Sequence, residues 1–128
     1  MIELNPLDRK GGRGMTDCVF FNIAERKAPA DIMYEDDVSI AFHDTDPRAP
    51  VHVLIIPKKH IRTTLDVGEE DAPLLGHLIL VANKIAQQTN ISEKGFRLVM
   101  NCGTQSGQSV WHIHLHLLGG RKMTWPPG

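Results

Sequence analysis

The stretch that decides the fold is HIHLHLL, residues 112–118, in which three histidines alternate with aliphatic residues. Strict alternation predicts a β-strand with one buried face, because successive side chains of a strand point to opposite faces of the sheet. We therefore expect Ile113, Leu115 and Leu117 to face a core and the histidines to line the other face. Histidine can attack an electrophile, bind a metal or change its charge near neutral pH, so this second face is a candidate functional site.

Three interpretations of the histidine face are open from the residues alone. It could be a solvated polar surface, a metal site or a site that handles a phosphate. Neighbouring same-face residues of a strand lie about 6.6 Å apart and the outer pair about 13 Å apart, whereas metal–nitrogen bonds are about 2 Å long. Two adjacent histidines could share an ion with a further ligand such as His52, but a site that uses all three would require a badly distorted strand.

A short uncharged loop with the sequence NCGTQSGQSV, residues 101–110, precedes this strand. Its glycines allow the backbone to approach a ligand closely, and consecutive N–H groups can form an anion-binding concavity. Ser109 adds a hydroxyl, and Asn101 and Gln108 add amides. Hairpin connections have a similar composition, but the direct junction with the histidines favours a cradle for a phosphoryl group.

Length and charge limit the classes of protein to which the chain can belong. Its 128 residues predict one domain over residues 15–128, preceded by a polar, glycine-rich and disordered extension, residues 1–14. The net charge of −1 argues against broad electrostatic binding to nucleic acid. Cys18 and Cys102 do not suggest a disulfide framework, and no apolar run reaches the length of a membrane span. We expect a cytoplasmic protein that could also enter the nucleus, with neither membrane nor nucleic acid among its partners.

The pattern of apolar residues predicts two helices and five strands. Asp17 is a suitable N-cap for a short helix that carries Val19, Phe20 and Ile23. A long helix is expected over residues 71–89, where apolar residues recur at helical spacing. Strands are expected at residues 32–34, 38–43, 51–56, 96–101 and 111–118. Short connections between neighbouring strands predict an antiparallel sheet of about five strands, and hence an α+β fold with one long and one short helix.

Residues 112–118 also resemble the His-φ-His-φ-His-φ-φ motif, with φ an apolar residue, of the histidine triad (HIT) superfamily of nucleotide hydrolases and transferases. Further motifs resemble the histidine triad nucleotide-binding (Hint) branch: FHD at 42–44, AP at 49–50, IPKKHI at 56–61, GQSV at 107–110, GGR at 119–121 and WPPG at 125–128. The resemblance covers nearly the whole chain, from about residue 17 to its last residue. It implies a HIT-like fold and a homodimer with a continuous sheet, in which the C-terminal segment of one subunit lies near the other subunit's site.

Displacing a group from a nucleotide phosphate requires a nucleophile, hydrogen-bond donors for the phosphoryl oxygens and a proton for the leaving group. The central histidine, His114, is the natural nucleophile because it has histidines on both sides. The resemblance implies that His114 forms a nucleotidyl-histidine intermediate, which water then hydrolyses. It also implies that Ser109 and His116 contact the phosphate, and that His112 and His52 form the supporting network.

A nucleotide pocket around these groups is implied by the same resemblance. Asp44 matches the acid that binds the ribose hydroxyls, although an aspartate before Pro47 could also simply cap its loop. Ala28 and Thr45 replace larger aliphatic residues usual at these pocket positions, which leaves the preference for a purine base open. The implied contacts are Phe20, Ile23 and Phe42 at the base, Asn101 near the phosphate and ribose, and Gly107, Gln108, Ser109, Val110, His114 and His116 along the phosphate. On pattern alone, the three apolar residues belong to the core.

Two other sets of residues are assigned ordinary structural roles. His43, His60 and His77 are expected to be hydrogen-bonded structural or surface groups, and Lys58, Lys59 and Arg62 to form a solvated strand end.

The residues and the resemblance together predict a phosphoramidase that binds purine nucleotides. It would cleave the P–N bond of nucleoside 5′-phosphoramidates and aminoacyl-adenylates, releasing a nucleoside monophosphate and an amine, with no cofactor or metal ion. The GGR and WPPG motifs favour this activity over dinucleoside polyphosphate hydrolysis, the other main activity of the superfamily. A non-catalytic zinc-binding or scaffolding protein on the same fold is the alternative from a different class.

Overall fold

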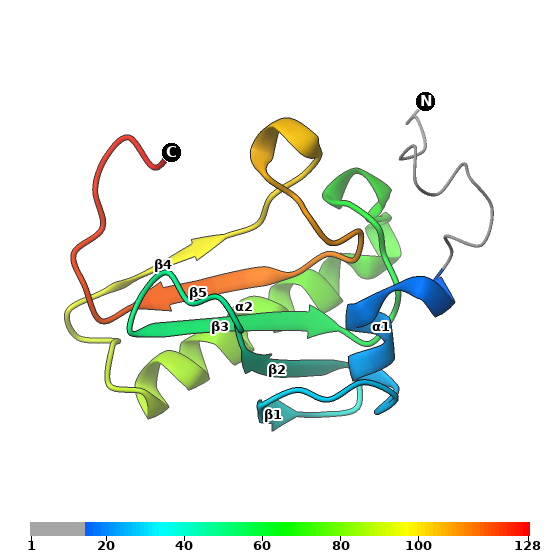
Figure 1. Cartoon of the computed structure of the whole chain (residues 1–128), viewed down its shortest axis with the longest axis horizontal. Helices are drawn as coiled ribbons and strands as arrows, with labels where there is room; N and C mark the ends of the chain where they lie inside the picture. The colour runs from blue at the N-terminus through cyan, green and yellow to red at the C-terminus, as the bar shows by residue number, and fades with distance from the viewer. Residues whose placement is uncertain (1–14) are drawn as a thin grey trace.

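The structure, a computed structural model, describes residues 15–128, and the extension expected at residues 1–14 lies outside the described part. Five antiparallel strands form one sheet in the order β1-β2-β3-β5-β4 (Figure 1). Their bounds are Ile32–Glu35 (β1), Ser39–His43 (β2), Val51–Pro57 (β3), Phe96–Val99 (β4) and Leu115–Gly119 (β5). The predicted α+β class and antiparallel sheet are confirmed.

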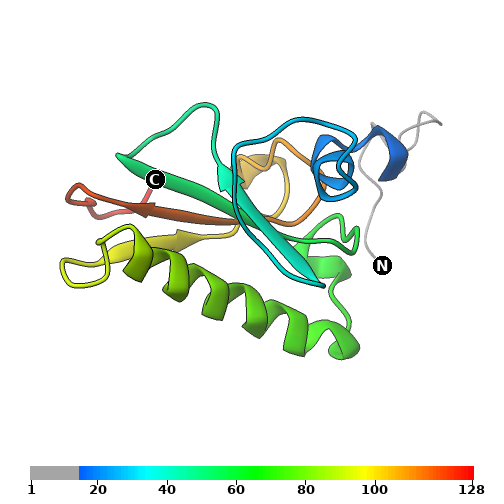
Figure 2. The ribbon, with the colours of Figure 1, turned by 90° about the horizontal axis from the view of Figure 1, so that it is seen from below.

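The long helix α2, Ala72–Gln88, covers one face of the sheet, and the short helix α1, Val19–Ala24, lies on the other side (Figure 2). Strands β2 and β3 supply side chains to both layers, because successive residues of a strand point to opposite faces. Ala41, Val53 and Ile55 pack in the cluster under α2, and Ile40, Phe42, Leu54 and Ile56 pack in the cluster with α1. This burial on both faces explains why β3 is a nearly continuous apolar run.

The two helices begin close to the positions that the sequence predicts. Asp71 is the N-cap of α2, as the expected helix over residues 71–89 requires. The predicted N-cap of α1 was wrong, because Asp17 ends a preceding 3-10 turn and Cys18 takes the N-cap position. The Sγ of Cys18 accepts a hydrogen bond from the N–H of Phe21 at 3.4 Å. Among the helices of residues 15–128, none combines the length and the apolar character that crossing a membrane would need.

Strand β5 begins at Leu115, later than the alternating pattern predicts. Strand β3 ends at Pro57, which has no N–H with which to continue the ladder. The carbonyl oxygen of Pro57 accepts a hydrogen bond from Nε2 of His112 at 2.8 Å. Ile113 donates its N–H to the carbonyl of Ile61 at 2.7 Å, so the chain here follows the segment after β3 rather than β3 itself.

The three histidines of the HIHLHLL stretch therefore do not share one exposed face. The aliphatic residues between them are buried, as predicted. His112 and His114 are buried as well, with exposed fractions of 0% and 5%, and His116 is only half-buried. The polar side of this stretch is a buried layer that must satisfy its nitrogens within the protein.

Candidate active site

A cavity of about 340 Å³ opens at the end of β2, beside α1 and against the loop that precedes β5. The predicted site residues that line it are Phe20, Ile23, Phe42, Asp44, Ser109, Val110, His114 and His116. The predicted residues that do not line it are His52, Asn101, Gly107, Gln108 and His112. Val19, Pro29, Ala30, His43 and Leu54 line it without having been assigned to it. His43 belongs to the FHD motif and was expected to be a structural or surface group, whereas the other four belong to no motif, so nothing in the sequence indicated that they would line the cavity.

His114 anchors one ring nitrogen and leaves the other free. Its Nδ1 lies 2.8 Å from the carbonyl oxygen of His112. Because a carbonyl can only accept a hydrogen bond, Nδ1 carries the proton and Nε2 keeps a lone pair. Burial lowers the pKa of His114 below its ordinary value, against the opposing effects of the His112 carbonyl and of Asp44. The ring is therefore neutral at pH 7 and has one nucleophilic nitrogen.

The backbone of Arg48 determines where His52 carries its proton. The N–H of Arg48 donates to Nδ1 of His52 at 3.0 Å, so the neutral ring must be protonated on Nε2. That Nε2 lies 2.9 Å from Nδ1 of His116 and 3.3 Å from Oδ2 of Asp44. When Nε2–H donates to His116, Nδ1 of His116 is the acceptor and its own proton sits on Nε2. His116 then offers a hydrogen-bond donor to the cavity.

Burial keeps this second pair of rings neutral. It lowers the pKa of His52, although the charge of Asp44 acts in the opposite direction. Burial, together with the neighbouring His114 and His52, lowers the pKa of His116 to about 4. Each ring therefore carries a single proton at pH 7, and the hydrogen bonds from Arg48 to His116 run in one direction.

His112 pairs with His60 rather than with His52. Nε2 of His112 donates to the Pro57 carbonyl, which leaves its Nδ1 as an acceptor 3.0 Å from Nδ1 of His60. Burial is the main cause that lowers the pKa of His112, to about 4. The predicted network of His112 with His52 is thus two separate pairs, His112 with His60 and His52 with His116. His60 was expected to be an ordinary structural group, because nothing in the spacing after β3 indicates its partner.

Among residues 15–128, two groups of side chains could hold a metal ion. Their ligand atoms lie within 4.8 Å of one another in Cys18, His60 and His112, and in Asp44, His52 and His116. In the second group, an ion on Nε2 of His52 would force the ring proton onto Nδ1, which already accepts from the Arg48 N–H. In the first group, an ion would replace the hydrogen bond between the two histidines. Metal binding at either group would therefore displace hydrogen bonds that hold the site in order.

Gln108 braces the loop that precedes β5. Its exposed fraction is 5%, and its Oε1 accepts a hydrogen bond from the N–H of Gly103 at 2.9 Å. Its Nε2 donates to the carbonyl of Arg62 at 2.8 Å and to that of Val110 at 3.1 Å. The amide is fully used inside the protein, so Gln108 shapes the loop instead of reaching toward a ligand.

The loop backbone is folded on itself in the same way. The N–H of Gly107 donates to Thr104 at 3.0 Å, and that of Gln108 donates to Gly103 at 3.2 Å. Gly107 and Gln108 were predicted to contact a phosphate, but their backbone N–H groups already donate hydrogen bonds within the loop. Gly103 and Gly107 have positive φ angles, 90° and 93°, a backbone conformation that favours glycine because it has no Cβ. Ser109 is exposed and brings a hydroxyl to the cavity.

Asp44 caps its loop, as one of the two sequence interpretations expects, and it also lines the cavity. Its Oδ1 accepts a hydrogen bond from the N–H of Asp46 at 2.8 Å, which caps the loop after β2. Its carboxylate also lines the cavity, with Oδ2 near His52. Capping one oxygen fixes the orientation of the carboxylate, so the two roles are compatible.

The apolar wall of the cavity is made by aromatic contacts from α1 and β2. The ring of Phe20 packs edge-to-face on Phe42 and on His114, with centroid separations of 5.5 and 4.9 Å. Thr45 lines the cavity, whereas Ala28 does not line it and packs against the core cluster that contains Phe20 and Phe42. The pocket residues are thus also core residues, which the apolar pattern alone could not separate.

The sequence predicts a solvated strand end for the basic residues after β3, and this holds for Lys59, whose side chain is 55% exposed, but not for Lys58 and Arg62, which are partly buried. Nζ of Lys58 lies 2.8 Å from Glu35, and Nζ of Lys59 lies 2.6 Å from Asp71. The side chain of Arg62 is only 18% exposed, and its guanidinium lies 5.8 Å above the ring of Trp111. These partners come from other elements, so the sequence near Lys58 could not identify them.

Known proteins with this sequence pattern and fold are numerous. The family model described as the HIT domain matches residues 25–123. An uncharacterized HIT-like protein of Synechococcus elongatus is 51% identical over 112 residues, which are 88% of this chain and 97% of that protein. A crystal structure of a HIT family hydrolase from Legionella pneumophila has a TM-score of 0.86 and 53% identity, covering 88% of this chain and all of the other. A histidine triad nucleotide-binding protein from Candida albicans has a TM-score of 0.74 and 27% identity, with 86% and 83% of the chains covered.

The matched residues include both histidine pairs and the loop braced by Gln108, so the similarity covers the chemical centre as well as the sheet. With this coverage and this identity to its relatives, the chain belongs to the HIT domain family.

Proposed function

We propose that the protein is a nucleoside phosphoramidase. It cleaves the P–N bond of nucleoside 5′-phosphoramidates and aminoacyl-adenylates through a nucleotidyl-histidine intermediate, giving a nucleoside monophosphate and an amine. The observation that carries this proposal is the anchoring of His114: Nδ1 is tied to the His112 carbonyl, and Nε2 is left with a lone pair beside the cavity.

In the first step, Nε2 of His114 attacks phosphorus and a new P–N bond forms to the ring, while the bond to the amine breaks and the leaving amine takes up a proton from water. The ring becomes cationic, and its Nδ1–H charge is stabilised by the carbonyl oxygen of His112 at 2.8 Å. The Nε2–H of His116 and the hydroxyl of Ser109 donate to the phosphoryl oxygens, where negative charge develops. In the second step, water attacks phosphorus and gives its proton to the solvent, and the P–N bond to His114 breaks, which returns the electron pair to Nε2 and releases the nucleoside monophosphate.

Binding of the nucleoside follows from the rest of the cavity. The carboxylate of Asp44 is oriented by its bond to Asp46 and accepts hydrogen bonds from the ribose hydroxyls. The base lies against the aromatic and aliphatic wall that contains Phe20, Ile23 and Phe42. The relatives support this proposal: one is named a HIT family hydrolase and another a histidine triad nucleotide-binding protein.

Steady-state kinetics on adenosine 5′-phosphoramidate, beside a diadenosine polyphosphate, test the proposal. We expect the phosphoramidate to have the higher kcat/KM, and His114→Ala to lower kcat by a factor on the order of 10⁴ to 10⁶, as expected for loss of a nucleophile. His77→Ala is the matched control, because it removes a histidine of α2 that contacts Asp36 and does not line the cavity. Undiminished activity of His114→Ala would overturn the nucleophile, and a preference for the polyphosphate would overturn the substrate class.

A further inference from the structure

The backbone of Arg48 connects the active site to a residue outside it. Its N–H donates to Nδ1 of His52 at 3.0 Å, and its carbonyl oxygen accepts a hydrogen bond from Nε of Arg121 at 2.9 Å. The side chain of Arg48 takes no part in this connection, because it is 72% exposed and its guanidinium binds Asp46 at 3.0 Å. The loop between β2 and β3 is thus held on one side by His52 and on the other by Arg121.

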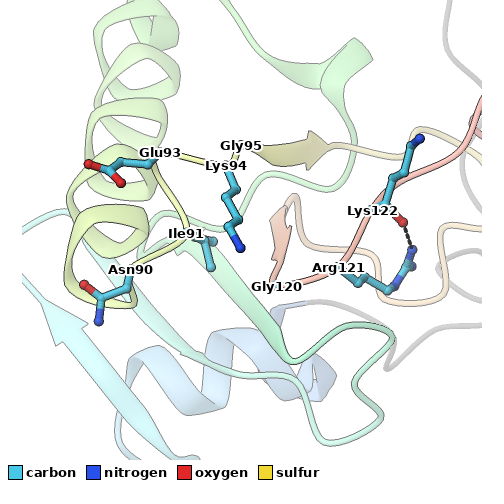
Figure 3. A pocket seen from close by; sticks show the side chains of 8 residues that line it. All are labelled: Asn90, Ile91, Glu93, Lys94, Gly95, Gly120, Arg121 and Lys122. Carbon is cyan, nitrogen blue, oxygen red and sulfur yellow. Dashed lines mark hydrogen bonds between the residues drawn. The ribbon is translucent and has the colours of Figure 1, made fainter.

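Arg121 reaches this loop because of the tight turn that follows β5. Gly120 has a φ of 91°, and a Cβ built on it would lie 2.9 Å from the Cβ of Pro50. A glycine here lets the two segments approach closely enough for the Arg121 side chain to reach Arg48. The guanidinium also donates from Nη1 to the carbonyl oxygen of Lys122 at 3.2 Å, which fixes its orientation (Figure 3).

Arg121 is separated from the reacting groups. It lines a second cavity, of about 580 Å³, formed with the loop between α2 and β4 (Figure 3). No residue lines both this cavity and the one that contains His114. Within one chain, the hydrogen bonds of Arg48 connect Arg121 to the active site through His52.

We propose that Arg121 is a positioning residue for the reaction: it holds the Arg48 peptide segment so that the Arg48 N–H keeps His52 in its Nε2–H tautomer. With that tautomer, His52 donates to Nδ1 of His116, and His116 carries its proton on the nitrogen that faces the phosphate. The opposite tautomer would direct an Nδ1–H of His52 at the Arg48 N–H and a lone pair at the carboxylate of Asp44. The inference rests on the proposed function for its kinetic consequence, but the tautomer of His52 exists without substrate.

The test uses two substitutions of nearly equal shape. Arg121→Met puts a methyl group where the Nε–H of the arginine lies, so the hydrogen bond to Arg48 is lost. Arg121→Gln puts an amide N–H at the same distance along the side chain and should restore it. Lys94→Met is the matched control, because Lys94 is a cation that lines the same cavity without a hydrogen bond to the Arg48 loop in the described residues.

Two readouts decide the outcome. In ligand-free protein, the ¹⁵N shifts of the His52 ring should report the Nε2–H tautomer in the wild type, in Arg121→Gln and in Lys94→Met, and a mixture of tautomers in Arg121→Met. On adenosine 5′-phosphoramidate, Arg121→Met should lower kcat about tenfold and change KM less than about twofold, as expected for one hydrogen bond remote from the ligand. An unchanged His52 tautomer in Arg121→Met, or a rise in KM alone, would overturn the inference. If the wild type fails to turn over the phosphoramidate, the proposed function falls, and the ¹⁵N shifts still decide the role of Arg121.

Discussion

His114 can attack phosphorus only while its ring is neutral, and its burial favours that state. Since burial lowers the pKa of His114 below 6.5, protonation removes the nucleophile only at more acidic pH. We expect the midpoint of the acidic limb of kcat/KM for adenosine 5′-phosphoramidate to lie below pH 6.5, because kcat/KM reports groups of the free enzyme. Initial rates from about pH 4 to about pH 9, with circular dichroism as a control for unfolding, measure this. A midpoint of the acidic limb above 6.5 would contradict the neutral, buried nucleophile.

The roles of individual histidines were only partly readable from the sequence. His114 could be selected because it lies between two other histidines, and the structure gives it one anchored and one free nitrogen. The partners of its neighbours depend on backbone groups far away in the chain, the Pro57 carbonyl for His112 and the Arg48 N–H for His52. Tautomers follow from such partners, and no spacing rule predicts them.

At the scale of elements, Asp36 ties the turn between β1 and β2 to α2. Its Oδ1 accepts hydrogen bonds from the N–H groups of Val38 and Ser39 at 2.9 and 2.8 Å. Its Oδ2 accepts one from the Tyr34 hydroxyl at 2.7 Å and lies 2.6 Å from Nε2 of His77 on α2. Burial alone would raise the pKa of Asp36, but these partners outweigh it and hold the pKa well below its ordinary value. The carboxylate therefore stabilises the fold above its ordinary pKa of 3.8, and this stabilisation is lost as pH falls further.

We expect Asp36→Ala to lower the free energy of unfolding by about 2 to 4 kcal/mol, because several hydrogen bonds to a charged group are lost together. Asp37→Ala is the matched control in the same turn: Asp37 is exposed, and its substitution should change stability by less than about 0.5 kcal/mol. Urea denaturation at pH 7 measures both. Equal stabilities of the two variants would contradict the role of Asp36 as the connection between the turn and the helix.

At the scale of the whole molecule, an edge strand and an aromatic side chain are open to contact with a second copy of the chain. Strand β4 is an edge of the sheet, and an edge strand presents backbone groups that can pair with another chain. Trp125, near the end of the chain, is 82% exposed. We propose that the chain forms a homodimer that extends the sheet and carries the C-terminal segment toward the other subunit's cavity.

Light scattering coupled to gel filtration should therefore give a mass of twice 14.3 kDa. A species of 14.3 kDa at micromolar concentration would contradict the dimer. Because the nucleophile and its partners lie within one chain, this result would leave the assignment of His114 intact.

The sequence by itself determined the α+β class, the antiparallel sheet and the long helix, because these depend on local periodicity and short connections. It also selected the central histidine as the candidate nucleophile, because the three histidines form a contiguous motif. It could not separate core from pocket at Phe20 and Phe42, since both roles require buried apolar side chains. Only the tertiary structure decided that the alternating stretch joins the sheet at Leu115 and not at its first histidine, because β3 ends at Pro57. Only it decided the pairs of His52 with His116 and His112 with His60, because each proton position depends on a donor or acceptor that long-range folding brings to the ring.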